Sequence, residues 1–291
     1  MKGEIKKNNS LYPKRLKGIK NPPEKLYYKG NPREDIFSKC LAVVGSRKMT
    51  KYGEKICDRL VSEVASRGIT IVSGFMYGID ATAHKAAVSV GGNTIAVMPC
   101  GIEKIHPAYQ KELYKEIIDK DGLIVSEMDG KKGPAKWIYP KRNRIVAGLS
   151  QATLVVQAAR GSGSLITANY AKKFDRKLFA VPGPLTSKVS IGTANLIKEG
   201  ADIVTCAKDI IDFYKPSQES IDFNKEKSLD DYKNINQKEK EILKNLQREP
   251  LKTDELARRT DLSAGKVGVV LSQMQLKGLV EKEGDKYYFN L

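Results

Sequence analysis

A basic segment with two aromatic residues inside it is the first part of the sequence whose residue types indicate chemistry. Residues 131–144 read KKGPAKWIYPKRNR and contain no carboxylate. Trp137 and Tyr139 lie among the cations, and a solvated run of charge has no need of aromatic rings. The pattern favours a polyanionic partner that also stacks on rings, although the formal net charge of +17 also suits a lysine-rich proteome with solvated surfaces. The cations of this segment are Lys131, Lys132, Lys136, Lys141, Arg142 and Arg144.

Four loops rich in small residues, each following an apolar run, have the composition of phosphate-binding turns. Glycine lets a phosphate approach the backbone, and the N–H groups at a helix start attract anions. Arg47 adds a planar guanidinium that suits phosphate oxygens. Glycine also closes ordinary strand-to-helix turns, so the prediction depends on several such loops lying on one rim of a sheet. The loops are Gly45-Ser46-Arg47, Ser73-Gly74-Phe75, Gly161-Ser162-Gly163-Ser164 and Pro182-Gly183.

The common nucleotide-binding motifs are absent from these loops. The loop at 45–50 reads GSRKMT rather than GxGxxG, and GSGSLI at 161–166 has isoleucine in place of the third glycine. No GxxxxGK[ST] sequence occurs, which excludes a P-loop nucleotide hydrolase. We therefore expect neither a dinucleotide cofactor nor any other cofactor.

Asp80 and His84 are spaced to share one face of a helix, as a catalytic pair would. Such a pair needs a nucleophile or a metal, and the sequence nominates neither. We expect instead that Asp80 caps or orients the start of the helix and holds His84. His106 is interpreted as a loop residue rather than a ligand. The chain is predicted to lack a catalytic residue set and to be no enzyme.

The four cysteines are widely scattered and form no CxxC pair, so a zinc site is not expected. Most of them lie beside apolar residues, which suggests small core residues in a reducing compartment. The N-terminus lacks the apolar stretch of a signal peptide, and no window reaches the length of a membrane span. The expected location is the cytoplasm, with no membrane partner.

Short β-branched runs that alternate with amphipathic stretches must position these loops. Apolar residues at successive positions are typical of parallel strands buried on both faces. In 51–66, Ile56, Leu60 and Val64 fall on one face of a helix. Strands alternating with helices predict a Rossmann-like, doubly wound α/β fold with a mostly parallel sheet. The predicted strands cover residues 41–45, 69–74, 93–98, 123–127, 152–158, 177–183 and 202–204.

The composition divides the chain into four parts. Residues 1–39, rich in Lys, Pro, Asn and Gly, are predicted to be an extended basic arm. Residues 40–214 form the Rossmann-like domain, and the polar residues 215–234 are interpreted as a linker. Residues 235–291 suggest three helices and a hairpin, which is a small winged-helix domain.

The winged-helix segment has a weak charge signal for binding DNA. It holds eleven Lys or Arg against nine Asp or Glu. Its expected recognition helix, 263–277, has only Lys266 and Lys277 as cations. A protein-docking or regulatory role is therefore as well supported as DNA reading. Thr253 and Ser263 are the expected N-caps of the second and third helices.

Taken together and in order, seven motifs resemble the DprA/Smf family (DNA processing protein A) over residues 12–214. Any one of them is modest evidence, whereas seven in order are highly specific, and the tail fits as well. The motifs are GSR at 45–47, SGFMYGIDATAH at 73–84, SE at 126–127, YPKRNRIVAGLS at 139–150, GSGSLITA at 161–168, AVPG at 180–183 and GTANLIKEGA at 192–201.

The resemblance implies sequence-nonspecific single-stranded DNA binding and a homodimer formed through the Rossmann-like domain. It also implies loading of a RecA-type recombinase onto incoming strands during natural transformation. By motif match, Arg47 grips a phosphate, while Lys136 and Tyr139 contact the strand. Arg142 and Arg144 line the same basic pocket. The alternative for Arg144 is that it is a buried structural arginine.

The sequence departs from the family pattern in two places. The small helical domain that many members carry at the N-terminus has no counterpart here. A tyrosine and a lysine that are frequent in the family after the third predicted strand are replaced in Ile105-His106-Pro107-Ala108, which puts a phosphate contact there in doubt. Tyr139 stands where phenylalanine is common, and either ring offers a stacking face.

Two rival functions stay open. A nucleotide phosphoribohydrolase has a similar order of strands and glycine loops, but its PGGxGT loop is missing from GSGSLIT at 161–167. A regulator could instead sense a small ligand with the Rossmann-like domain and read duplex DNA with the winged helix. Nucleotide hydrolysis would identify the first rival, and a preference for duplex would identify the second.

Overall fold

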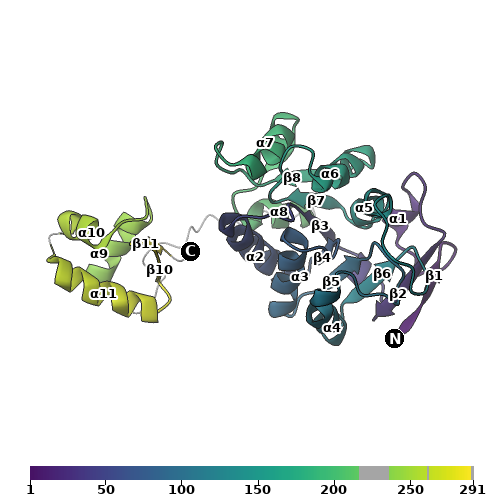
Figure 1. Cartoon of the computed structure of the whole chain (residues 1–291), viewed down its shortest axis with the longest axis horizontal. Helices are drawn as coiled ribbons and strands as arrows, with labels where there is room; N and C mark the ends of the chain where they lie inside the picture. Colours follow the sequence, from purple (N-terminus) through teal and green to yellow (C-terminus); the bar gives the residue numbers. More distant parts are fainter. Residues whose placement is uncertain (216–235, 261, 290–291) are drawn as a thin grey trace. The chain divides into compact units, whose positions relative to one another are not determined.

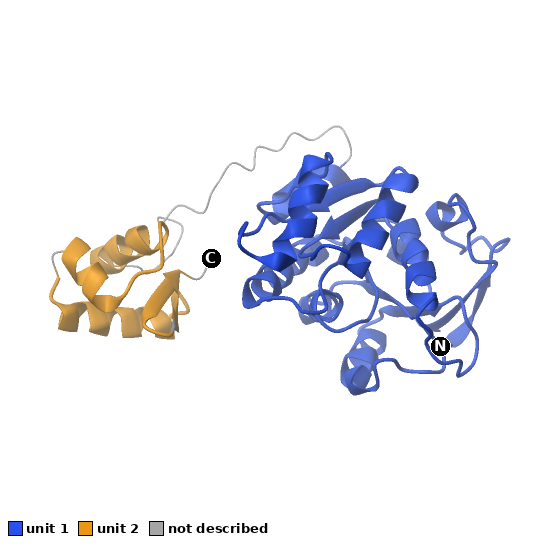
Figure 2. Cartoon of the chain, turned by 45° about the horizontal axis from the view of Figure 1, so that its top comes forward, with its two compact units in different colours: residues 1–218 blue, residues 219–291 orange. Residues whose placement is uncertain are grey.

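The computed structural model describes residues 1–215, 236–260 and 262–289 and divides the chain into two compact units, residues 1–218 and 219–291 (Figure 2). The predicted linker, 215–234, lies outside the described residues except for Lys215. Each unit is built around its own hydrophobic core.

A nine-stranded sheet forms the centre of the first unit, in the order β1-β2-β6-β5-β4-β3-β7-β8-β9 (Figure 1). Strands β3 to β9 are parallel to one another, as in a doubly wound fold. Each of the seven predicted apolar runs forms one of these strands, and five of them are buried at every position because helices cover both faces. Their bounds are β3 Cys40–Val44, β4 Thr70–Ser73, β5 Thr94–Val97, β6 Leu123–Ser126, β7 Ala152–Val155, β8 Lys177–Ala180 and β9 Asp202–Ile203.

Helices cover the two faces of the sheet in separate layers. The residues of β3 alternate between the layers, since Leu41 and Val43 pack on one side and Ala42 and Val44 on the other. On the first side lie α2 (Lys51–Ser66), α3 (Ile79–Ser89), α4 (Lys111–Asp119) and α8 (Ala207–Tyr214). On the second side lie α1 (Lys14–Lys17), α5 (Ile138–Leu149), α6 (Gly163–Lys173) and α7 (Ile191–Lys198). The predicted helix at 51–66 is confirmed, and its N-cap Thr50 accepts a hydrogen bond from the N–H of Gly53.

The prediction of an extended arm at 1–39 is wrong. Residues Lys2–Lys6 (β1) and Lys25–Gly30 (β2) are antiparallel strands, and β2 pairs with β6 at one edge of the sheet. The segment buries single apolar side chains, including Leu16 and Leu26, that are separated by lysine and proline. The Tyr12 hydroxyl also donates a hydrogen bond to the Pro23 carbonyl. Tertiary pairing along an existing sheet edge thus stabilises strands whose own composition predicts none.

The second unit is a winged helix, as predicted. Helices α9 (Gln237–Leu246), α10 (Thr253–Arg259) and α11 (Ala264–Leu276) are followed by the hairpin β10–β11, Val280–Glu283 and Lys286–Phe289. Gly284 has a positive φ of 65° in the hairpin turn. Ser263 is the N-cap of α11 as expected, whereas Lys252, not Thr253, precedes α10. No helix among the described residues is long and apolar enough to cross a membrane.

Candidate functional site

A groove of about 560 Å³ opens at the carboxyl ends of β3 and β4, beside the first turns of α5 and α6; we call it the rim groove. This is the edge at which parallel sheets bind ligands. The structure brings nine of the thirteen predicted site residues to its wall, although they come from four separate segments of the chain. They are Ser46, Arg47, Gly74, Lys136, Tyr139, Arg142, Ser162, Gly163 and Ser164.

Arg47 is exposed on the wall of the rim groove and lies over two aromatic rings. Its guanidinium carbon is 5.3 Å from the ring centroid of Tyr139 and 5.8 Å from that of Tyr77. These distances are typical of cation–π contacts. The Tyr139 hydroxyl is 2.9 Å from His106 Nε2. The ring that contacts the Arg47 guanidinium is thus itself held by a hydrogen bond.

The first turn of α6 presents bare backbone to the groove. The Ser162 hydroxyl caps the helix by accepting a hydrogen bond from Ser164 N. A Cβ on Gly163 would meet no atom within 4 Å, so packing does not require glycine there. The missing side chain leaves the N-terminal N–H groups of α6 accessible, which is the arrangement that binds anions. Gly161 precedes this turn with a positive φ of 73° and lies outside the groove wall.

Arg142 lines the groove but is largely committed to the fold. It is 5% exposed, and its Nη1 donates hydrogen bonds to the carbonyls of Gly74 and Val97. A Cβ at Gly74 would collide with the Arg142 guanidinium and the Asp80 carboxylate, so this glycine makes room for two side chains rather than for a ligand. Arg142 therefore adds positive charge to the groove floor without extending into solvent.

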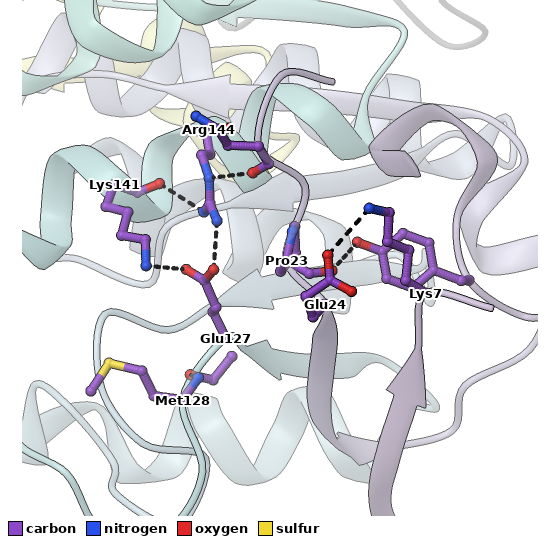
Figure 3. A network of polar contacts seen from close by, with 10 residues as sticks. Lys7, Pro23, Glu24, Glu127, Met128, Lys141 and Arg144 are labelled. Atoms are coloured by element: carbon purple, nitrogen blue, oxygen red, sulfur yellow. Dashed lines mark hydrogen bonds and ion pairs between the residues drawn. The ribbon is translucent and has the colours of Figure 1, made fainter. Parts of the chain in front are cut away.

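Three predicted contacts are not positioned as expected. The Phe75 ring is fully buried against His84 and Tyr114, so its prediction as a contact is wrong for the side chain. Arg144 is the buried structural arginine of the alternative interpretation: it is 6% exposed, pairs with Glu127 at 2.5 Å and donates to the Asn21 carbonyl. Lys141 pairs with the other oxygen of Glu127 at 3.4 Å (Figure 3).

Asp80 and His84 do not form the expected pair. Asp80 Oδ2 accepts a hydrogen bond from Met76 N, so the carboxylate does orient the start of α3. Burial raises the pKa of Asp80, while the charge of Arg142 opposes that shift. His84 Nδ1 instead lies 2.7 Å from Thr94 Oγ1, and burial lowers the pKa of His84 to about 3. The expectation that Asp80 holds His84 is therefore wrong, and His84 is a neutral core residue.

The buried thiols have no reactive character. Cys40, Cys57 and Cys100 are buried and unpaired by disulfides, as predicted for most cysteines, whereas Cys206 is exposed. Burial raises the pKa of the Cys40 thiol to about 12 and that of Cys100 to about 11. Such thiols remain protonated at neutral pH and are poor nucleophiles.

Sequence reasoning did not identify Tyr77 and His106 as the partners of Arg47 and Tyr139, the two residues of this cluster on the groove wall. His106 lies in a loop, as predicted, and its ring also contacts Tyr139 edge-on at 6.3 Å. The only signal in the sequence was that both His106 and Tyr139 depart from the pattern of the resembled family. Tyr77 lies inside one of the seven motifs, but nothing in the sequence indicates that its ring meets Arg47.

The chain matches two family models. One, described as DNA recombination-mediator protein A, covers residues 4–215, and the other, the DprA winged helix domain, covers residues 231–286. The protein Smf of Escherichia coli is 38% identical over 233 residues, which are 75% of this chain and 62% of the relative's length. The DNA processing protein DprA of Streptococcus pneumoniae is 40% identical over 203 residues, which are 70% of this chain and 71% of that protein.

Two solved structures are similar to the chain. That of DNA processing protein A from Streptococcus pneumoniae has a TM-score of 0.70 at 37% identity and covers 74% of this chain and 75% of its own. That of DNA processing protein A from Helicobacter pylori, described for its single-stranded DNA binding mode, has a TM-score of 0.65 at 31% identity. It covers 73% of this chain and 95% of its own.

Proposed function

This chain belongs to the DNA recombination-mediator protein A family, and we propose from that premise that its rim groove binds single-stranded DNA without reading the bases. The observation that carries the proposal is the placement of Arg47 on the Tyr139 ring beside the bare first turn of α6. Non-specific single-strand binding needs cations for phosphates and rings for bases, and both occur here within one groove.

The residues of the groove divide into two kinds of contact. Arg47 and Lys136 are exposed and form no ion pair within the described part of the chain, so they can bind phosphates at no cost in broken pairs. The N–H group of Gly163 offers a second position for a phosphate, whereas that of Ser164 already donates to the Ser162 hydroxyl. Tyr139 is partly exposed and offers a ring face on which a base can stack. Neither kind of contact depends on the base sequence.

The proposal includes a role in recombination. Single-stranded DNA held by its backbone keeps its bases available, so the bound strand can be passed to a RecA-type recombinase during natural transformation. The likeness to proteins named for DNA processing, and the family description as a recombination mediator, support this role. The proposed location is the cytoplasm.

We also propose that two copies of the first unit form a homodimer through the edge of the sheet at β9. Large apolar side chains are exposed on β9 and in the segment between β8 and β9: Leu185 is 89% exposed, Ile203 50% and Ile191 39%. An edge strand with unpaired backbone groups and apolar neighbours is suited to pairing with a second chain. Sedimentation of Ile203→Lys beside the unchanged protein tests this, because a lysine on the edge should yield monomers.

Titration of the protein with labelled oligo-dT and with a duplex of the same length, at two salt concentrations, tests the main proposal. We expect tighter binding of the single strand and a clear loss of affinity at higher salt. A preference for duplex would favour the ligand-sensing regulator instead. The proposal also holds that binding is not accompanied by catalysis, since Asp80 at the groove floor is held by Met76 N. Release of base or phosphate from nucleotides in proportion to protein concentration would contradict this.

A further inference from the structure

Four side chains from four separate segments form a connected row, and two of them, Arg47 and Tyr139, line the rim groove. His106 follows β5, Tyr139 lies in the first turn of α5, Arg47 follows β3, and Tyr77 precedes α3. His106 contacts Tyr139 through a 2.9 Å hydrogen bond and an edge-on ring contact at 6.3 Å. Arg47 then lies between the rings of Tyr139 and Tyr77. The position of the cation is therefore tied to a ring whose own orientation depends on His106.

The protonation states of the pair favour one direction for this hydrogen bond. Burial raises the pKa of the Tyr139 hydroxyl, so the phenol keeps its proton. Burial lowers the pKa of His106, and the charges of Lys104 and Arg47 lower it further. A neutral imidazole beside a protonated phenol accepts the hydrogen bond at Nε2, which places its own proton on Nδ1.

Without the hydrogen bond to His106, fewer contacts would restrain the orientation of the Tyr139 ring. An exposed arginine has many rotamers, and the two rings beneath Arg47 restrict them before any ligand binds. If the Tyr139 ring is already held in one orientation, Tyr139 and Arg47 lose less conformational entropy when a strand binds.

We propose that His106 is a positioning residue for single-stranded DNA: its hydrogen bond to Tyr139 fixes the ring that supports Arg47, and so prepares the base platform and the phosphate cation together. The inference rests on the proposed function of the rim groove. It pairs His106 with Tyr139: the Tyr139 hydroxyl donates the hydrogen bond and the neutral imidazole accepts it.

The pair also links DNA binding to protons. The charged groups that face His106 are Lys104 on its own loop and Arg47 from the loop after β3, and both disfavour an imidazolium. A phosphate bound at Arg47 offsets that repulsion, so the bound complex takes up a proton more readily than the free protein. By linkage, affinity rises as the pH falls toward the ordinary histidine range, and the imidazolium then donates to the Tyr139 oxygen.

The test measures binding of labelled oligo-dT to His106→Phe, Tyr139→Phe, the double variant and His106→Gln. Each single loss of the hydrogen bond should weaken binding about two- to tenfold, the size of one net hydrogen bond. The double variant should be no weaker than either single variant, since both remove the same bond. His106→Gln should recover most of the affinity, because an amide can take the place of Nε2. Tyr109→Phe, on a tyrosine that is 70% exposed, is the matched control and should bind normally.

The pH arm separates positioning from folding. Between about pH 7.5 and about pH 5.5 the unchanged protein should gain affinity, whereas His106→Gln should show a flat profile. Melting temperatures of all variants identify any that fail to fold. If folded His106→Phe binds like the unchanged protein while Tyr139→Ala or Arg47→Ala loses affinity, the positioning role is wrong and the groove proposal stands. If Tyr139→Ala and Arg47→Ala also bind normally, the proposed function itself is wrong.

Discussion

The rim groove and the exposed face of α11 are both surfaces at which folds of these kinds meet nucleic acids, but their charges are arranged differently, although Lys266 on α11 is exposed like the groove cations. In the rim groove, Arg47 and Lys136 extend into solvent without an ion pair in the described part of the chain. On α11 and the residue that follows it, Lys277 is bound to the buried carboxylate of Glu239 at 2.8 Å.

The apolar residues of the two surfaces differ as well. On α11, Val269 is 60% exposed and Leu276 is 90% exposed, and both are aliphatic side chains that offer no ring face for stacking. In the rim groove the ring of Tyr139 lies directly beneath Arg47. The comparison shows that a winged helix does not by itself imply DNA reading, whereas a specific arrangement of cation, ring and helix start supports a binding role.

Replacing Tyr139 by Ala has the largest effect expected in the groove. Loss of the stacking face should cost about 1–3 kcal/mol of single-strand affinity, with the salt dependence almost unchanged, because stacking releases no counterion. Val269→Ala on α11 is the matched control and should bind normally. The ring is only partly exposed, so a lower melting temperature in place of weaker binding would indicate a core role instead.

Acid should affect the two units at different pH values. Burial lowers the pKa of His84 from 6.5 to about 3, so its contribution to stability is full above pH 6.5 and is lost as the pH falls toward 3. At about pH 5 the first unit should lose about 2 kcal/mol through this residue.

The second unit should respond only at lower pH. Burial raises the pKa of Glu239, but hydrogen bonds from Lys277 and from the backbone of Asn236 outweigh it and hold the pKa below the ordinary 4.5. Its contribution is therefore present above pH 4.5 and lost below. As the pH is lowered from 7 to 4, calorimetry should show the thermal transition of the first unit shifting before that of the second. The variant His84→Asn is the control. Equal shifts of both transitions would contradict this difference.

The sequence predicted the parts of the fold whose signal is local. The apolar runs of β3 to β8 are continuous, so their hydrophobic pattern reveals them, and the small residues after them mark the rim. Strands β1 and β2 were not predicted because their apolar residues, Ile5 and the short run Leu26-Tyr27-Tyr28, are flanked by lysines and glycines. Pairing with each other and with β6 stabilises these strands.

Side-chain directions in the site could not be predicted in the same way. Arg142 and Arg144 are two residues apart in one basic run, yet each is buried by partners far away in sequence, Gly74 and Glu127. The contact of His106 with Tyr139 joins residues separated by a whole βα unit. Such pairs depend on tertiary packing, which composition does not encode.

Two further substitutions test the phosphate contacts. Arg47→Ala and Lys136→Ala should each reduce the slope of log K against log salt by about 0.7, the contribution of one single-strand phosphate. Between about 50 mM and about 200 mM salt this amounts to a change of about threefold in the ratio of affinities. Lys266→Ala, on α11, is the control and should keep the full slope. A full slope in Arg47→Ala as well would mean that its guanidinium binds no phosphate.

Removing residues 219–291 should have the smallest effect on single-strand binding. The winged-helix segment, residues 235–291, has eleven Lys or Arg against nine Asp or Glu, whereas residues 1–214 have thirty-six against twenty. Affinity for oligo-dT should therefore stay within about threefold of the full chain. The first unit has its own core, so a separate thermal transition should persist in the shortened protein.

The salt slope makes this last comparison stricter than affinity alone. If α11 bound phosphates beside the rim groove, the full chain would show a steeper slope than the shortened protein, by about 0.7 for each contact. If the full chain and the shortened protein have equal slopes and equal affinities, phosphate binding is confined to the first unit. The exposed Val269 and Leu276 would then be a surface for a protein partner. A shortened protein that folds but loses binding would reverse the comparison, because the nearly neutral unit would then supply the contacts that the basic groove was expected to make.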